Sequence, residues 1–159
     1  IRMLSRLKPK RIVIVSSSPQ IRYPDCYGID MSKMGDFIAF NAAVSLAKER
    51  GKENCLKELH ERCKELQRNH QLDTENVAKQ LYKMFTTEEI SAKIAQLITP
   101  PGLDIPVDVI FQSIEDLHRS CPNNLGDWYF TGNYPTPGGN KVVNKAFMNY
   151  MEGKNVRGY

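Results

Sequence analysis

Long apolar runs are absent from this sequence. No stretch of its 159 residues approaches the ~20 consecutive apolar residues that span a bilayer, and no charged segment followed by an apolar core opens the chain, as it would in a secretory signal. With 41% hydrophobic and 25% charged residues, the composition is that of an ordinary globular domain. We therefore expect a soluble, cytoplasmic protein with no membrane partner.

The common nucleotide-binding and hydrolase motifs are also missing. The chain contains no Gly-x-Gly-x-x-Gly, no Walker loop, no Gly-x-Ser-x-Gly and no His-Glu-x-x-His. The sequence therefore gives no support to dinucleotide binding through a glycine-rich turn, to a P-loop, to a serine hydrolase or to a zinc peptidase.

Cysteine is sparse, and its spacing matches no disulfide framework. Cys26 and His118 could act as a nucleophile pair only if the fold brought them together, and nothing close to Cys26 in the sequence activates its thiol. We expect free thiols in a reducing compartment. The cysteines are Cys26, Cys55, Cys63 and Cys121.

A zinc site is the alternative reading of Cys55, His60, Cys63 and His70. At 100° per residue on a helix, these side chains point in at least two directions, and Cys63 belongs to an apolar stripe. A core thiol with surface histidines is the favoured interpretation, so no metal site is predicted.

Charge is mixed rather than one-sided. Lysine and arginine number 22 against 18 acids, which gives a net charge of +4, and the two signs are interleaved along the chain. This balance gives weak support for a phosphate-bearing ligand and poor support for a nucleic-acid partner.

The residues Ile12 to Val15 predict a strand. They are consecutive, β-branched and apolar, a pattern typical of a parallel strand that is buried on both faces. Hydroxyl residues follow at once, and loops that leave the carboxyl ends of such strands are where α/β sheets bind ligands. Residues 16–31 are therefore the candidate binding loop, although an ordinary surface loop remains an open alternative.

Residues 32–98 are predicted to be nearly all helical. Ser32 is the expected N-cap of a first helix that ends near Gly51, a residue suited to the left-handed position after a helix. A second helix is expected from Glu53 to about Arg68, since apolar residues recur there at three- and four-residue spacing. These apolar residues are Leu56, Leu59, Cys63 and Leu66.

Two further helices complete this section. Asp73 or Thr74 could cap a third helix, and Thr86 with Glu89 has the form of a capping box that opens a fourth. The apolar positions of the third are Val77, Leu81, Met84 and Phe85, and those of the fourth are Ile90, Ile94, Leu97 and Ile98.

The chain then returns to alternating strand and helix. Val107–Phe111 predicts a second strand, and Ser113 with Asp116 predicts the start of a short helix. Trp128–Thr131 is a candidate short strand in a loop-rich region, and Lys141–Met151 is expected to form the last helix.

Three segments of this chain, in order, resemble the glutamine phosphoribosylpyrophosphate amidotransferase family. The loop after the first strand reads Ser-Ser-x-Pro-x-Ile-x-x-Pro-x-x-Tyr-Gly-Ile-Asp, beginning at Ser16. Val107–Leu117 is similar to the family's late strand and helix, and Phe130–Thr136 is similar to its closing Phe-Thr-Gly-x-Tyr-Pro-Thr.

The resemblance implies a truncated type I phosphoribosyltransferase fold, which is Rossmann-like with a mostly parallel sheet, carrying a helical insertion. Residues 1–43 and 99–159 would form the carboxyl-terminal part of that domain, and residues 44–98 a mostly helical section that contains the insertion. Ile1, Leu4 and Leu7 continue a helical spacing, so we expect a piece of a longer protein.

The activity implied for the full-length enzyme is the synthesis of 5-phosphoribosylamine from phosphoribosylpyrophosphate and glutamine, the first committed step of de novo purine biosynthesis. The family's double-aspartate motif, which holds diphosphate and magnesium, and its glutaminase cysteine are absent from this chain. The fragment alone is therefore expected to be inactive and to hold no catalytic residue.

The resemblance places a substrate-binding loop at Ser17, Ser18, Tyr23, Tyr27 and Asp30. The two serines could offer hydroxyl and backbone N–H groups at the strand end, and the other three could shape the mouth of the site. A structural role stays open for each, because Asp30, for example, could simply cap a helix.

One branch of the family holds an iron–sulfur cluster, which is not expected here. Asp25 stands where the first cysteine ligand of that branch would be, with Cys26 one residue late, and Asp127 to Tyr129 replace its cysteine pair.

A second hypothesis is that the helical section is a protein-interaction or oligomerisation module without catalysis of its own. In addition, a sheet without its first strands would expose Ile12 to Val15, and such surfaces tend to be covered by another chain. We therefore expect a homo-oligomer.

Overall fold

Two parallel strands, β1 (Ile12–Ser16) and β2 (Val107–Phe111), form the sheet of the computed structural model, which describes residues 1–26, 31–123 and 126–158. Their register runs from Ile12 opposite Val107 to Ser16 opposite Phe111. Parallel neighbours need a long crossover, and here the helix-containing residues 17–106 provide it. The α/β class, the second strand and the parallel pairing predicted from sequence are confirmed.

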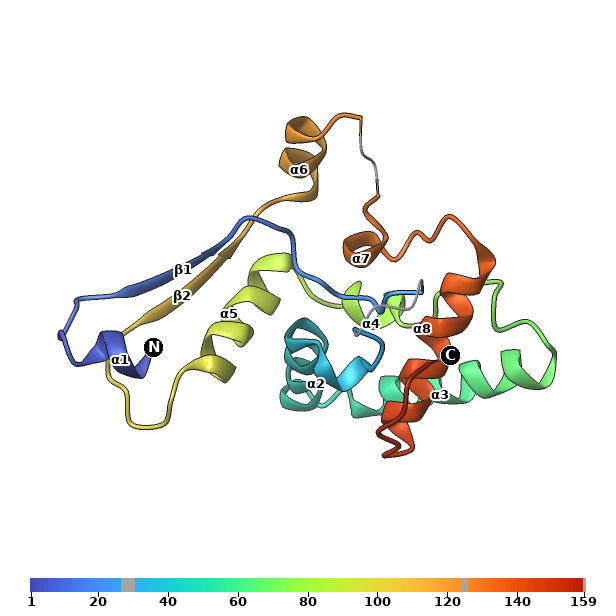
Figure 1. The fold of residues 1–159 in the computed structure, drawn as a ribbon. Helices are drawn as coiled ribbons and strands as arrows, with labels where there is room; N and C mark the ends of the chain where they lie inside the picture. The colour runs from blue at the N-terminus through green and yellow to red at the C-terminus, as the bar shows by residue number, and fades with distance from the viewer. Residues whose placement is uncertain (27–30, 124–125, 159) are drawn as a thin grey trace.

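Figure 1 shows the two strands side by side at one end of the molecule. Helix α5 (Thr87–Ile98) runs alongside them and packs against β2. A single helical turn, α1 (Arg2–Ser5), precedes β1. The remaining long helices gather at the opposite end of the molecule.

Strand β1 is covered on one face only. Ile12 is 6% exposed, whereas Val13 and Val15 on the other face are 47% and 71% exposed, and Ile110 of β2 beside them is 53% exposed. The prediction that Ile12 to Val15 are buried on both faces is therefore wrong. The physical reason is that α5 covers one face, and no other element of the described residues covers the second. The separate expectation that residues of Ile12 to Val15 would be exposed is confirmed for Val13 and Val15.

The helix predicted over Glu53–Arg68 is confirmed as α3, with the same bounds and with all four of its predicted core residues buried. The capping box that opens α5 is also present. Thr86 Oγ1 accepts a hydrogen bond from the Glu89 backbone N–H at 3.1 Å, and a Glu89 carboxylate oxygen accepts one from the Thr86 N–H at 2.8 Å. These local signals determine both helices because they need no distant partner.

Ser32 does not cap a helix. Residues Met34–Asp36 form a 3-10 turn, and α2 runs over Ile38–Glu49 with the extended residue Phe37 at its N-cap. Ser32 is fully buried, and its hydroxyl has no hydrogen-bond partner among the described residues. The prediction is wrong because the chain first places the apolar side chains of Met34 and Phe37 in the core.

The third predicted helix is much shorter than expected. Only α4 (Lys79–Tyr82) is helical, and neither Asp73 nor Thr74 caps it. The Thr74 hydroxyl instead donates to the carbonyl of residue 71 at 2.8 Å, and the carbonyls of residues 72 and 75 accept hydrogen bonds from the buried Asn144 side chain. A side chain from the far end of the sequence therefore holds this segment as a loop.

Helix α6 (Ile114–Ser120) begins as predicted, because Ser113 Oγ accepts a hydrogen bond from the Asp116 N–H at 3.0 Å. The short strand predicted at Trp128–Thr131 is wrong, since these residues form one helical turn, α7. Helix α8 runs over Pro137–Met151 and starts four residues earlier than expected, with proline in its first turn.

One apolar core joins the helical section to the carboxyl-terminal helix. Helix α3 packs against α8, and Phe40 of α2 makes edge-to-face contacts with Phe147 and Tyr150 at centroid distances of 6.1 and 4.8 Å. Residues from 44–98 and from 99–159 therefore bury each other's apolar faces. None of the helices in the described residues has the length and apolar character needed to cross a membrane.

Candidate functional site

The carboxyl ends of β1 and β2 lie side by side, and a loop follows each strand there. Beyond β1, the Ser16 hydroxyl donates to the Ser18 carbonyl at 3.0 Å and lies 3.3 Å from the Ser18 backbone N–H. These contacts fold residues 16–18 into a tight turn in which Ser17 is exposed. In α/β sheets this edge is where ligands bind.

A crevice of about 320 Å³ lies between these two strand ends and the start of α5. Its walls combine apolar rings with charged and amide side chains, which is the usual make-up of a small-molecule site. The residues that line it include Pro19, Arg22, Glu88, Gln112, Glu115 and Phe130.

Gln20 is the buried polar residue behind this crevice, with only 3% of its surface exposed. Its amide nitrogen donates to the Thr87 carbonyl and to Ser91 Oγ, both at 2.9 Å. These bonds fix the orientation of the amide, so that Gln20 Oε1 faces Arg22. The loop after β1 is thereby fastened to the first turn of α5.

Arg22 is held in place by three kinds of contact. Its Nε and Nη2 donate to Gln20 Oε1 at 3.1 and 2.7 Å, and Nη2 also donates to Thr87 Oγ1 at 3.2 Å. The guanidinium carbon lies 5.3 Å from the centre of the Tyr82 ring, a cation–π distance. Among the described residues no carboxylate pairs with Arg22, and its Nη1 has no acceptor.

Two carboxylates and an unsatisfied amide line the same crevice. Glu88, in the first turn of α5, and Glu115, in the first turn of α6, are exposed, and neither forms an ion pair with a described residue. Gln112 Oε1 is buried and has no donor among the described residues. A buried acceptor without a donor is the expected mark of a site that a ligand or water completes.

The loop after β1 is hydrogen-bonded to residues 129–134, more than a hundred residues away in sequence. The backbone N–H groups of Arg22 and Tyr23 both donate to the Tyr129 carbonyl, at 2.8 and 3.1 Å. The Tyr129 hydroxyl donates to Asp25 Oδ1 at 2.8 Å, and the Tyr134 hydroxyl donates to the carbonyl of residue 24. The two segments therefore form one structural unit beside the strand ends.

Gly132 allows this close approach. Its φ of +69° is a left-handed conformation, and a Cβ atom there would lie 2.6 Å from Asn76 Nδ2 and 2.9 Å from the Tyr23 ring. Tyr23 is 3% exposed and packs edge-to-face on Tyr82 at 5.2 Å. Glycine is required here both for its backbone angle and for lack of space.

Burial changes the chemistry of the tyrosines in this unit. Desolvation raises the pKa of Tyr23 above its ordinary value, and it raises the pKa of Tyr134 as well. Burial first, and then the hydrogen bond to the Asp25 carboxylate, raise the pKa of Tyr129. All three phenols therefore stay protonated at neutral pH and act as hydrogen-bond donors or packing groups.

Of the five residues predicted for the binding loop, the structure describes three. Ser17 and Ser18 lie at the carboxyl end of β1, as predicted from sequence, whereas the Tyr23 ring is packed inside the unit formed with residues 129–134. Tyr27 and Asp30 lie outside the described residues.

Gln20 and Arg22 are not among the site residues predicted from the sequence. Both lie within six residues of the end of β1, so their place just after the strand could be seen in the sequence. What the sequence could not show is that Gln20 would be buried and that Arg22 would line a crevice without forming an ion pair with a described residue, because Thr87, Tyr82 and Gln112 come from distant parts of the chain.

The cysteines and histidines do not converge. In the part of the chain that the structure describes, no group of three histidine, cysteine, aspartate or glutamate side chains could hold a metal ion. Cys63 is fully buried in the core, and burial raises the pKa of its thiol to about 12. His118 Nε2 lies 3.2 Å from an Asp127 carboxylate oxygen.

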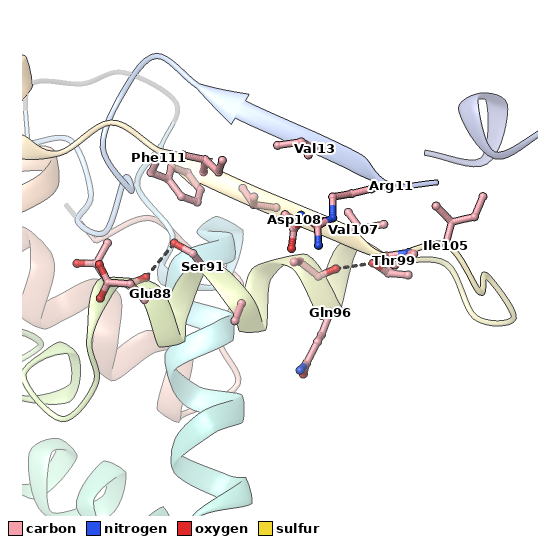
Figure 2. Close-up of a pocket in the computed structure, with 16 residues that line it drawn as sticks. Arg11, Val13, Glu88, Ser91, Gln96, Thr99, Ile105, Val107, Asp108 and Phe111 are labelled. Atoms are coloured by element: carbon pink, nitrogen blue, oxygen red, sulfur yellow. Dashed lines mark hydrogen bonds and ion pairs between the residues drawn. The ribbon is translucent and has the colours of Figure 1, made fainter. Parts of the chain in front are cut away.

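A larger open groove of about 970 Å³ runs between β2 and α5, as Figure 2 shows. At one end of the groove Arg11 lies 3.2 Å from the Asp108 carboxylate, and at the other Ser91 Oγ donates to the Thr87 carbonyl, so these polar groups are already paired. Because Arg22 and Gln112 converge on the smaller crevice, we take that crevice as the candidate site.

No family model matches this sequence, and searches of curated proteins and of solved structures found no match either.

Proposed function

We propose that this chain is the carboxyl-terminal portion of the phosphoribosyltransferase domain of an amidophosphoribosyltransferase, with the type I fold and with residues 44–98 containing a helical insertion. The observation that carries the proposal is that two of the resembling segments, the loop that begins at Ser16 and Phe130–Thr136, lie together beside the carboxyl ends of two parallel strands. This is the edge at which α/β sheets bind ligands. The Tyr134 hydroxyl donates to the carbonyl of residue 24, and the carbonyl of Tyr129, directly before the second segment, accepts hydrogen bonds from the N–H groups of Arg22 and Tyr23.

In the full-length enzyme, ammonia released from glutamine would displace pyrophosphate from phosphoribosylpyrophosphate to give 5-phosphoribosylamine, the first committed step of de novo purine biosynthesis. The anomeric carbon develops positive charge in such a displacement, so the protein's main tasks are to place donors around the diphosphate and to exclude water. Magnesium and diphosphate would be held by a double-aspartate segment that this chain lacks.

The contribution of this chain would be one wall of that site. Ser17 is exposed at the turn after β1, and its hydroxyl is not used by any described residue, so it is available to a substrate oxygen. Ser18 is partly buried, and its hydroxyl lies 3.3 Å from Ser16 Oγ, which keeps the turn in shape. The chain of 159 residues would be inactive without the rest of the enzyme, which we place in the cytoplasm.

The most direct test is the gene itself. The sequence upstream of Ile1 should encode a hydrophobic strand that ends in two adjacent aspartates and, further back, a cysteine directly after the initiator methionine. A gene that lacks both features would refute the enzyme assignment.

A kinetic test addresses the turn after β1. In the full-length enzyme, Ser17→Ala should raise the KM for phosphoribosylpyrophosphate by about tenfold or more, because a hydrogen bond to a charged oxygen contributes roughly 1.5–3 kcal/mol. Ser5→Ala, on the exposed turn α1, is the matched control. Equal KM values for the two variants would remove Ser17 from the site.

A further inference from the structure

Arg22 differs from the other arginine of this chain that stacks on a ring. The guanidinium carbon of Arg50 lies 5.2 Å from the centre of the Phe85 ring, almost the same distance as Arg22 from Tyr82. Arg50, however, also pairs with the Glu89 carboxylate. Arg22 is held by the neutral oxygens of Gln20 and Thr87, so its position is fixed while its charge is left uncompensated by the described residues.

Such an arginine is prepared to bind an anionic group. Its orientation is set by a buried amide that is itself fixed by two hydrogen bonds, so little side-chain entropy is lost when a ligand arrives. The guanidinium keeps Nη1 without an acceptor among the described residues, so this nitrogen can donate a charge-assisted hydrogen bond to an oxygen of a carboxylate or a phosphate.

The rest of the crevice argues against a ligand that is only anionic. Glu88 and Glu115 line it together with Arg22, so the formal charge of its wall is negative. A phosphate dianion would gain one cation and meet two carboxylates. A ligand that carries one negative and one positive group matches both ends.

Apolar side chains complete the walls. Phe111, Ile114 and Phe130 line the crevice together with Pro19. They offer the ligand an apolar surface, and a volume of about 320 Å³ lies at the lower end of the range for small-molecule sites.

We propose that the strand-end crevice binds a small apolar amino acid as its zwitterion, with the ligand carboxylate on Arg22 and the ligand ammonium facing Glu88 and Glu115. Gln20 acts as a positioning residue that orients Arg22 from behind. This inference rests on the described residues and not on the proposed enzyme activity.

The test uses calorimetric titration of the full-length protein with three probes of one carbon skeleton. L-leucine carries both charges, 4-methylpentanoate lacks the ammonium, and 3-methylbutylamine lacks the carboxylate. L-leucine should bind at least about tenfold more tightly than either single-charge analogue, because each charge contributes a charge-assisted hydrogen bond. Binding of L-leucine that is equal to or weaker than the binding of either analogue overturns the proposal. Tighter binding of ribose 5-phosphate than of L-leucine, measured in a separate titration, overturns it as well.

Variants separate the two charges. Arg22→Lys should weaken the binding of L-leucine and 4-methylpentanoate by about tenfold and leave that of 3-methylbutylamine unchanged, because lysine cannot reproduce the hydrogen bonds to Gln20 and Thr87 that place the free Nη1 of Arg22. The double variant Glu88→Gln with Glu115→Gln should weaken the binding of L-leucine and of 3-methylbutylamine. It should leave the binding of 4-methylpentanoate unchanged.

Two variants outside the crevice are the controls. Arg50→Lys matches the stacked arginine, and Glu58→Gln matches an exposed helical carboxylate. Neither should change the affinity for any probe. If Arg22→Lys weakened all three probes equally while its circular dichroism stayed unchanged, the crevice would be selecting shape rather than charge, and the proposal would be wrong.

Discussion

Four long-range polar contacts converge on the side chain of Asn144. It is fully buried in α8, and its amide nitrogen donates to the carbonyls of Leu72 and Glu75 at 2.8 and 2.7 Å. Its oxygen accepts from the Val77 N–H at 3.0 Å and faces the Cys63 thiol at 3.9 Å. One amide thus satisfies three backbone groups of a loop that would otherwise be buried unpaired.

Replacing Asn144 with leucine, which has a similar volume, should therefore lower the free energy of unfolding by roughly 3 kcal/mol or more, since each backbone group left unsatisfied costs about 1–3 kcal/mol. Urea denaturation measures this loss. Asn155→Leu, at an exposed site without a described partner, should stay near wild type. A loss below about 1 kcal/mol would mean that water replaces the amide in the core.

Gly132 and Gly153 have almost the same backbone conformation, with φ of +69° and +68°, but different surroundings. Alanine at either position costs about 1 kcal/mol for its left-handed φ. At Gly132 its Cβ would also lie within 3.0 Å of Asn76 and Tyr23, whereas nothing lies within 4 Å at Gly153.

Gly132→Ala should consequently lose a further ~1–3 kcal/mol of unfolding free energy relative to Gly153→Ala, from steric overlap in a packed site. Thermal or urea unfolding of the two variants gives the difference directly. If both variants lost the same amount, Gly132 would be needed for its backbone angle alone.

At the scale of the element, the first turn of α5 links the ionisation of one side chain, Glu89, to the stability of the fold. The pKa of Glu89 is lowered from its ordinary value, first by its hydrogen bond to Arg50 and then by the Thr86 backbone N–H. A lowered pKa in the folded state means that the ionised carboxylate stabilises the fold. This contribution is present above the pKa of the unfolded chain and is lost as pH falls through the folded value.

Acid unfolding of the wild type should therefore show a steeper loss of stability below about pH 4.5 than that of Glu89→Gln, which carries no titrating group there. Glu88→Gln is the matched control, because it removes the neighbouring carboxylate, which forms no ion pair with a described residue. Parallel pH profiles for wild type and Glu89→Gln would show that the capping box holds without the charge.

Elements that depend on local signals were predictable from sequence. The bounds of α3 follow from its leucine stripe, the start of α5 from the Thr86 and Glu89 pair, and the bounds of β2 from a short β-branched run. In each case the residues that decide the structure lie within one or two turns of one another.

Elements that depend on distant contacts were not predictable. The aromatic residues Trp128–Thr131 favour a strand by composition, yet they form a helical turn that ends at Gly132 and is tied to the loop after β1. Gly132 was the one sequence signal for a helix here, because glycine commonly follows the last residue of a helix. The burial of Ser32 and Gln20 had no signal at all, because the residues that cover them come from elsewhere in the chain.

For the molecule as a whole, the two-stranded sheet is the least complete part. Both β1 and β2 are edge strands in the described residues, and the outer face of β1 carries exposed valines. The helical end has a closed apolar core, whereas α5 is the helix of the described residues that packs against the sheet. Unpaired edges next to apolar side chains are the features through which sheets recruit further chain segments.

The chain of 159 residues should therefore self-associate through this surface. Val15, 71% exposed and next to the free edge of β1, is its most accessible side chain, so Val15→Lys should shift the sedimentation coefficient toward that of a monomer by placing a charge on each apposed face. Val156→Lys, at a site 54% exposed in the carboxyl-terminal segment, should leave association unchanged. A wild-type chain that stays monomeric at high concentration, and that binds no dye specific for apolar surfaces, would show that the sheet is stable without a partner.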